Sequence, residues 1–332
     1  MVFANEDYEP YANSRDESVK NLLDEYGIDL KLYQDHVVFR PGDILKDDGK
    51  PYTVYTPFKN KWLRKLNVTE FPLVETLSNG IFYNSKNELP SLYSMGFEQS
   101  LIEVDDYKLD GLSNYEQERN LPAVDGTSKL GPHLRFGTVS IRSVVNSFKE
   151  NPVLLSEIIW REFFIHILHH FPYSITRNFK VKYDSVKWLN NKGDFKKWCE
   201  GKTGYPIVDA GIRQLIQTGN MHNRVRMVVA SFLCKHLLID WRWGEAFFAK
   251  HLLDYELSSN VGNWQWVAGT GCDSAPYFRV FNPMEQQRKF DGAGEYIRKW
   301  VKDIDELTYP LPMVDHKMAR SRAVETYKIG LS

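Results

Sequence analysis

Glu157, Trp160 and Arg161 have side chains that could act together on a ligand. Residues three and four positions apart lie on one face of a helix, so these three side chains are expected to share a face. A carboxylate, an aromatic plane and a guanidinium can together hold a flipped base and its phosphate. The same residues also suit a plainer arrangement, in which an Arg–Glu pair lies beside a core tryptophan.

A second group opens the apolar segment Met221–Leu233 with Asn223, Arg224 and Arg226. A charge at the start of a buried helix needs a partner, because burying an unpaired charge is costly. The acidic residues further along the chain, Asp254 and Glu256, are candidate partners. A helix N-terminus in solvent is the alternative.

Tryptophan is concentrated in one part of the chain. Eight of the nine tryptophans lie between Trp160 and Trp300, with dense clusters at 241–243 and 263–266. Indole rings can stack on bases or be oxidised. A tryptophan-rich helical core would explain each one taken singly.

The segment Gly126–Pro132 combines small hydroxylic residues, a lysine and two glycines ahead of an expected helix. Such a turn can present backbone N–H groups to a diphosphate. It matches neither a Walker motif nor a dinucleotide-binding fingerprint, and it also suits an ordinary turn.

Composition excludes several classes of protein. Apolar residues make up 42% of the 332 residues, and no run of eighteen apolar residues predicts a membrane span. The N-terminus lacks the pattern of a signal peptide. Three widely spaced cysteines suit a reducing compartment, so we expect a cytoplasmic protein without a metal site.

The net charge of −1 is unevenly distributed. Residues 1–103 carry 11 basic and 17 acidic side chains, whereas residues 104–332 carry 31 basic and 26 acidic ones. The C-terminal part is therefore mildly basic and could offer a phosphate-binding face.

The chain begins like one βαβ unit, with strands at 2–4 and 36–39 around a helix at 11–26 that Gly27 ends. One such unit cannot cover both faces of a parallel sheet, so further strands are expected upstream. Residues 67–103 lack periodicity and predict a linker. Helices are expected at 55–66, 111–119, 140–149, 153–170, 206–217, 222–238, 244–253 and 294–301.

Taken together, these segments resemble the photolyase/cryptochrome family, most closely its bacterial class I cyclobutane pyrimidine dimer photolyases. The most specific stretches are 160–164, 201–210, 221–227 and 260–282. The resemblance implies a mainly α fold. An all-helical FAD-binding and DNA-binding domain (104–332) follows a linker (69–103) and the remnant of an N-terminal α/β, Rossmann-like domain (1–68), with roughly the family's first hundred residues lacking.

The resemblance also implies a flavin site and an electron-transfer chain. Asn260 would face flavin N5, where an amide can hydrogen-bond either protonation state. The other residues expected to bind FAD are Tyr115, Thr127, Ser128, Lys129, Leu130, Gly131, Arg226, Asp254, Tyr255 and Glu256. Electrons would pass to the flavin through Trp188, Trp241 and Trp264.

The family's substrate site maps onto a further set of residues. Glu157 would hydrogen-bond a flipped pyrimidine dimer, with Trp160, Asn223 and Met227 around it. Contacts with DNA phosphates would come from Arg119, Arg161, Arg224, Arg279, Gln286 and Lys289. The implied activity is light-driven dimer repair by electron transfer from reduced FAD, by a monomer acting on damaged DNA.

Other activities of the family remain open. A cryptochrome-type light sensor would bind FAD without repair, and a (6–4) photoproduct photolyase would use histidine near the dimer. Asn260, Met227 and Trp160 favour repair over sensing. Met227 and Asn223 both disfavour the (6–4) reaction. A fragment without activity is the fourth alternative.

The resemblance to the family has two gaps. Asn5 and Glu6 match only part of its folate-antenna site, so neither a folate nor a deazaflavin antenna is expected here. Asn220 replaces a tryptophan that many relatives carry, which would loosen one wall of the pocket.

Overall fold

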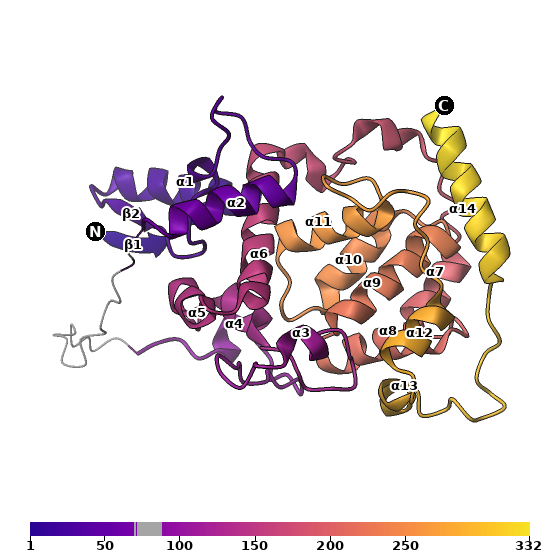
Figure 1. Ribbon diagram of the computed structural model, residues 1–332. Helices are drawn as coiled ribbons and strands as arrows, with labels where there is room; N and C mark the ends of the chain where they lie inside the picture. Colours follow the sequence, from indigo (N-terminus) through magenta and orange to yellow (C-terminus); the bar gives the residue numbers. More distant parts are fainter. Residues whose placement is uncertain (70, 72–87) are drawn as a thin grey trace.

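The computed structural model describes residues 1–69, 71 and 88–332 (Figure 1). The described part is mainly helical, as the sequence predicts, with a small α/β unit at the N-terminus. Its elements are β1 (Val2–Asn5), α1 (Pro10–Glu25), β2 (Leu30–Tyr33), α2 (Tyr55–Leu66), α3 (Tyr115–Glu118), α4 (Leu130–Phe136), α5 (Ile141–Phe148), α6 (Pro152–His170), α7 (Lys192–Cys199), α8 (Pro206–Thr218), α9 (Asn223–Ser231), α10 (Trp241–His251), α11 (Leu257–Ala268), α12 (Pro283–Phe290), α13 (Glu295–Trp300) and α14 (His316–Leu331).

The N-terminal βαβ unit is present, but its second strand is not where the sequence predicts it. β1 pairs in parallel with β2, in the register Val2↔Leu30, and Gly27 follows the end of α1. The expected strand at 36–39 is irregular backbone instead. Its N–H groups at Val38 and Phe39 donate to the Glu162 carboxylate, so they are unavailable to a neighbouring strand.

The N-terminal unit, residues 2–33, has almost no core of its own. All four residues of β1 are exposed, β2 has a single half-buried residue, and Ala12 is the only buried residue of α1. A two-stranded sheet is marginally stable when nothing covers it. This unit therefore depends on the rest of the chain for its order.

Residues 37–66 are packed quite differently. Phe39, Phe58 and Trp62 are buried in one hydrophobic core with α5 and α6. Figure 1 shows α2 lying beside α6 at the junction of the two halves. The core thus crosses the domain boundary predicted between residues 68 and 104. The expected linker includes residues 70 and 72–87, which lie outside the described part, and the domain limits stay a prediction.

A second core is formed mainly by α8, α9, α10 and α11. Local signals define their ends: Pro206 begins α8, Gly219 ends it with a positive φ, and Asp240 caps α10 by accepting from the Arg242 N–H. The helix predicted at 222–238 is α9 followed by a π-helical turn at Phe232–His236.

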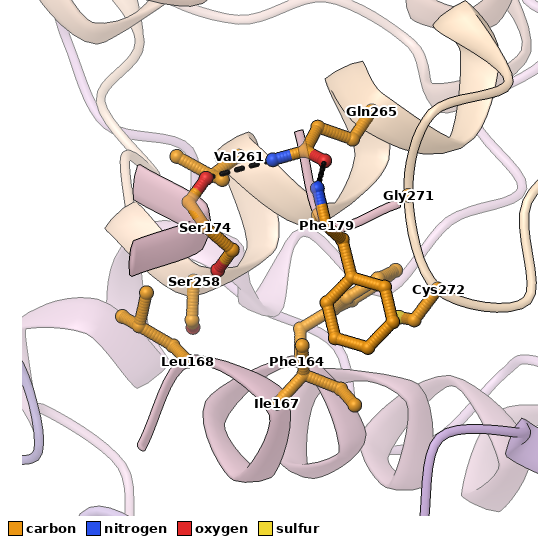
Figure 2. Close-up of a pocket in the computed structure, with 11 residues that line it drawn as sticks. Phe164, Ile167, Leu168, Ser174, Phe179, Ser258, Val261, Gln265, Gly271 and Cys272 are labelled. Atoms are coloured by element: carbon orange, nitrogen blue, oxygen red, sulfur yellow. Dashed lines mark hydrogen bonds between the residues drawn. The ribbon is translucent and has the colours of Figure 1, made fainter. Parts of the chain in front are cut away.

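The position of α11 is fixed from both sides. Gln265 donates to the Ser174 carbonyl oxygen at 2.7 Å and accepts from the Phe179 N–H at 2.8 Å (Figure 2). On another face, Gly244 of α10 lies directly against the Trp264 ring, where any side chain would collide. These contacts hold α11, and with it the residues expected to reach the flavin.

No helix in the described part of the chain combines the length and apolar character needed to cross a bilayer.

Candidate flavin and DNA site

Three distant segments expected to bind FAD meet around Asp254. The Arg226 guanidinium donates to Asp254 Oδ2 at 2.9 Å, as the sequence anticipated. Gly131 of α4 approaches the same carboxylate so closely that an added Cβ would lie 2.7 Å from Oδ2. Glycine at 131 is therefore needed to bring the turn 126–132 against Asp254.

The Asp254 carboxylate supplies a test of whether a cofactor fits here. Its Oδ1 atom is buried and accepts no hydrogen bond from any described residue. A buried acceptor without a partner is costly, which favours a donor from a bound group. The ribose hydroxyls and N–H groups of FAD are such donors, so the residues present fit this cofactor.

The lysine of the same turn has partners within the protein. Lys129 lies 3.2 Å from both Asp105 and Asp125, and its backbone has a φ of 54°. The Ser128 carbonyl oxygen accepts from the Lys108 N–H at 2.8 Å. Lys129 thus stabilises the turn that holds Thr127 and Leu130, and its predicted contact with a diphosphate would need these pairs to rearrange.

Asn260 is 9% exposed and uses its amide hydrogens within the protein. Its Nδ2 donates to the backbone oxygen of Glu245 at 3.1 Å and to Oε1 of the same residue at 2.9 Å. The Tyr255 hydroxyl also donates to Glu245 Oε1, at 3.4 Å. Sequence reasoning missed Glu245, because nothing in its spacing connects it with a residue fifteen positions away on another helix.

Glu256 lies in a buried cluster of charges. Its Oε1 is 2.9 Å from Arg161 and 3.2 Å from His36, and the hydroxyl of Ser259 donates to Oε2 at 2.6 Å. Arg161 and His36 lower the pKa of Glu256 to about 2, against the opposing effect of burial. Glu256 is thus ion-paired with Arg161 and with the loop after β2, although its buried Oε1 accepts no hydrogen bond from any described residue.

The same cluster bears on the role predicted for Arg161. Its side chain is 12% exposed, pairs with Glu256 and donates to the His36 carbonyl oxygen at 2.8 Å. This position favours a structural role over the expected contact with a DNA phosphate.

Glu157 and Arg119, predicted separately, form an ion pair at 2.8 Å with both side chains partly exposed. The Arg119 guanidinium also lies 5.3 Å from the Tyr115 ring. Burial, with Glu157 nearby, raises the pKa of Tyr115 to about 12. Arg119, a predicted DNA contact, therefore lies between two other predicted site residues. They are Glu157, expected to contact the dimer, and Tyr115, expected to contact the flavin.

Arg224 lines the same region from the start of α9. It donates to Asn120 Oδ1 at 2.6 Å, lies 4.5 Å from the Phe290 ring and contacts the sulfur of Met227 at 3.6 Å. Asn223 is the first residue of α9, beside it. The structure thus brings Arg224 and Met227 together, as the helical spacing implies.

Trp160 has a neighbour that the sequence did not suggest. Its ring stacks face to face on Tyr55 of α2, with centroids 3.5 Å apart and planes at 6°. The Tyr55 hydroxyl donates to the Ser156 carbonyl oxygen at 2.8 Å. One face of Trp160 is therefore covered, and the Phe163 and Phe164 rings also lie beside it, with centroids 5.7 and 5.6 Å away.

The three predicted electron carriers have different surroundings. Trp264 makes an edge contact with Trp198 at 6.3 Å, Trp241 donates its indole N–H to Asn178 at 2.9 Å, and Trp188 meets Tyr327 at 5.9 Å. Within the described ranges, no ring contact joins Trp264, Trp241 and Trp188 directly. The chain of carriers stays a prediction.

The remaining predicted DNA contacts lie just before α12 or within it. Arg279 lies 5.2 Å from the Phe281 ring and 6.0 Å from the Trp266 ring. Gln286 and Lys289 are both on α12, and Lys289 lies 5.2 Å from the Phe290 ring that Arg224 also contacts. Phe290 thereby links this group to the region of α9.

Comparison with known proteins agrees with this arrangement. Residues 154–308 match the family described as the FAD binding domain of DNA photolyase, and residues 1–75 match DNA photolyase. The deoxyribodipyrimidine photo-lyase of Vibrio cholerae is 38% identical, over 99% of this chain and 79% of the relative. That of Escherichia coli is 37% identical, over 98% and 78%.

Solved structures give the same result. A class III photolyase from Agrobacterium tumefaciens is 36% identical with a TM-score of 0.82, and an archaeal photolyase from Sulfolobus tokodaii is 32% identical with a TM-score of 0.85. Each match covers 99% of this chain and 79% of the solved one. Assignment to class I rather than class III stays a prediction. The fold and the relatives agree, and the chain belongs to the DNA photolyase family.

Proposed function

We propose that this chain repairs cyclobutane pyrimidine dimers in DNA with light, using bound reduced FAD as electron donor. The observation that supports this most is the meeting of Gly131, Arg226 and Asp254, with a buried acceptor left free on Asp254. Reduced FAD supplies the excited electron, so the protein needs to hold donor and dimer close together.

The residues around the site divide this work. Asp254 and Arg226 would hold the cofactor. Glu157 would hydrogen-bond a dimer extruded from the duplex, while Trp160 and Met227 would pack against it. Extrusion costs least for a damaged pair, which contributes to selectivity.

A basic rim would hold the DNA backbone. Arg119, Arg224, Arg279 and Lys289 carry positive charge beside this site and would neutralise phosphates. We further propose that the chain acts as a monomer. We also place it in the cytoplasm, because three widely spaced cysteines suit a reducing compartment.

Two measurements test the proposal. Protein incubated with FAD and then denatured should release flavin, detected by its absorbance. The reduced protein under blue light should restore the 260 nm absorbance of an oligonucleotide carrying a cyclobutane dimer, and should not do so in the dark. Bound flavin without repair would favour the light-sensor alternative, and repair of a (6–4) photoproduct instead would favour that enzyme.

A further inference from the structure

We infer that Glu9 is a positioning residue for the flavin site: its carboxylate joins α4 to α11 and thereby couples the order of the N-terminal unit to FAD binding. The inference rests on the cofactor part of the proposed function, because the coupling acts only if FAD binds where these two helices meet. It does not depend on repair.

The Glu9 carboxylate serves a helix other than its own. Glu9 is the N-cap residue of α1, but its side chain makes no capping hydrogen bond there. Its Oε1 instead accepts from the Leu257 N–H at 3.2 Å, 248 positions away in the sequence. Leu257 is the first residue of α11, and Glu256 before it does not cap that helix with its side chain. Glu9 therefore supplies an acceptor that the start of α11 lacks locally.

The same oxygen is shared with α4. The Arg135 guanidinium, in the last turn of α4, donates to Glu9 Oε1 at 3.4 Å. The helix thus meets the chain around the start of α11 twice. The first contact is direct, where Gly131 lies against Asp254, and the second runs through Glu9, where Arg135 and Leu257 share one acceptor.

Both members of this ion pair are largely withdrawn from solvent. The side chain of Glu9 is 16% exposed and that of Arg135 is 26% exposed. Burial raises the pKa of Glu9, while Arg135 and the Leu257 N–H oppose that rise. The positive end of the α11 dipole also favours a carboxylate at this place. Without Glu9, the Arg135 guanidinium would lose its carboxylate and the Leu257 N–H its acceptor.

Glu9 is in turn fixed by its neighbours in the chain. Asp7 Oδ1 accepts from the Tyr8 N–H at 2.6 Å and from the Glu9 N–H at 3.1 Å, and the Tyr8 ring makes an edge contact with His169 of α6 at 6.2 Å. The segment between β1 and α1 is therefore held against the helical part of the molecule. Because β1 and α1 bury little else, the contacts of this segment also order them.

FAD binding and the order of the N-terminal unit should therefore be linked. A cofactor that holds α4 and α11 in place also holds both partners of the Glu9 carboxylate. Coupling between two sites acts equally in both directions. FAD should thus slow amide exchange in residues 2–33, and loss of Glu9 should weaken FAD binding.

The test compares amide hydrogen exchange of the whole chain with and without bound FAD, by mass spectrometry. FAD should slow exchange in residues 2–33 of the unmodified chain, and Glu9→Ala should lose this slowing. The FAD dissociation constant of Glu9→Ala, from titration of flavin fluorescence, should rise about fivefold or more. Glu17→Ala, at an exposed glutamate of α1, is the matched control and should behave as the unmodified chain does.

Glu9→Gln distinguishes the hydrogen bond from a general loosening of the segment. Glutamine keeps an oxygen that can accept from the Leu257 N–H, so this variant should retain most of the slowing by FAD. A glutamine variant as uncoupled as Glu9→Ala would overturn the hydrogen bond to α11 as the link. Equal slowing by FAD in the unmodified chain and in Glu9→Ala would overturn the inference as a whole.

A second variant covers the case in which Glu9→Ala does not fold. Arg135→Met removes only the α4 side of the link, so it should raise the FAD dissociation constant and reduce the slowing in residues 2–33. Unchanged values in Arg135→Met would count against the inference.

Failure of the inference is distinguishable from failure of the proposed function. If the chain binds FAD but repairs no dimer, the proposed repair fails, and the exchange measurement still decides the role of Glu9. If the chain binds no FAD, both fail.

Discussion

At the scale of single residues, the Glu157–Arg119 pair connects the predicted dimer contact with the predicted DNA contact. Glu157→Ala should reduce repair by pre-reduced enzyme about tenfold or more, because an unmatched polar group on the dimer costs roughly 1–3 kcal/mol. Binding to undamaged DNA should change much less. Repair is measured by recovery of 260 nm absorbance and binding by fluorescence anisotropy; equal loss on damaged and undamaged DNA would contradict the role of Glu157.

Arg279 provides the contrasting variant. Its guanidinium lies 5.2 Å from the Phe281 ring and 6.0 Å from the Trp266 ring, and we predict that it contacts phosphate. Arg279→Ala should weaken binding to damaged and undamaged DNA alike and reduce the salt slope by about 1. Anisotropy titrations across a range of salt concentrations check this, and a loss confined to damaged DNA would reassign Arg279 to the dimer.

Trp264 offers a sharper test because a matched tryptophan touches it. Trp264→Phe should slow photoreduction of oxidised flavin more than tenfold and leave repair by pre-reduced enzyme largely intact, since phenylalanine is much harder to oxidise. Trp198→Phe alters an equally buried ring in edge contact with Trp264 but outside the predicted chain, and should retain photoreduction. Flavin absorbance under illumination measures both, and the reverse pattern would move the electron path to Trp198.

At the scale of elements, α14 is fastened to the π-helical turn by two histidines. His236 Nε2 lies 2.9 Å from His316 Nδ1, and Arg322 donates to the His236 carbonyl oxygen at 2.6 Å. Burial, together with His316 and Arg322, lowers the pKa of His236 to about 3. The neutral ring is therefore the form that the packed helix accepts.

The lowered pKa predicts acid sensitivity. A histidine with a folded-state pKa below its unfolded value of about 6.5 contributes full stability above pH 6.5 and loses it as pH falls toward 3. At pH 5 the free energy of unfolding should fall by about 2 kcal/mol from His236 alone. Urea unfolding at pH 7.5 and 5.0 should show a smaller decrease in His236→Gln; equal decreases would show that His236 does not titrate in this range.

At the scale of the whole molecule, the backbone should be much less ordered before residue 36 than after it. Residues 2–33 bury almost nothing, whereas Phe58 and Trp62 of α2 are in the core with α6. Amide hydrogen exchange should therefore be fast in β1, α1 and β2 and slow in α2, because protection follows local burial. Mass spectrometry of exchanged peptides resolves this, and β1 amides as protected as those of α6 would show that another contact covers the sheet.

The sequence predicted α2, α5, α6, α8, α9, α10 and α13, because periodic apolar residues and caps such as Asp240 act over a few positions, but it did not predict α7, α11, α12 or α14. Family motifs anticipated the Arg226–Asp254 pair. What it missed depends on residues far apart in the chain. The Glu162 carboxylate accepts hydrogen bonds from the N–H groups of Val38 and Phe39, over 120 positions earlier in the chain, so the predicted strand at 36–39 does not form. No local pattern near residue 37 predicts this contact.

The stacking of Tyr55 on Trp160 has a consequence for recombination between relatives. Tyr55 lies before the linker and Trp160 after it, and Trp62 donates to Glu162 across the same divide at 2.6 Å. A crossover placed in the linker would join partners that have not been matched to each other. Chimeras built there should not fold stably unless Tyr55, Trp62 and the facing side of α6 are exchanged together. The segment that has to be exchanged as one is therefore the α2–α6 pair, rather than either domain.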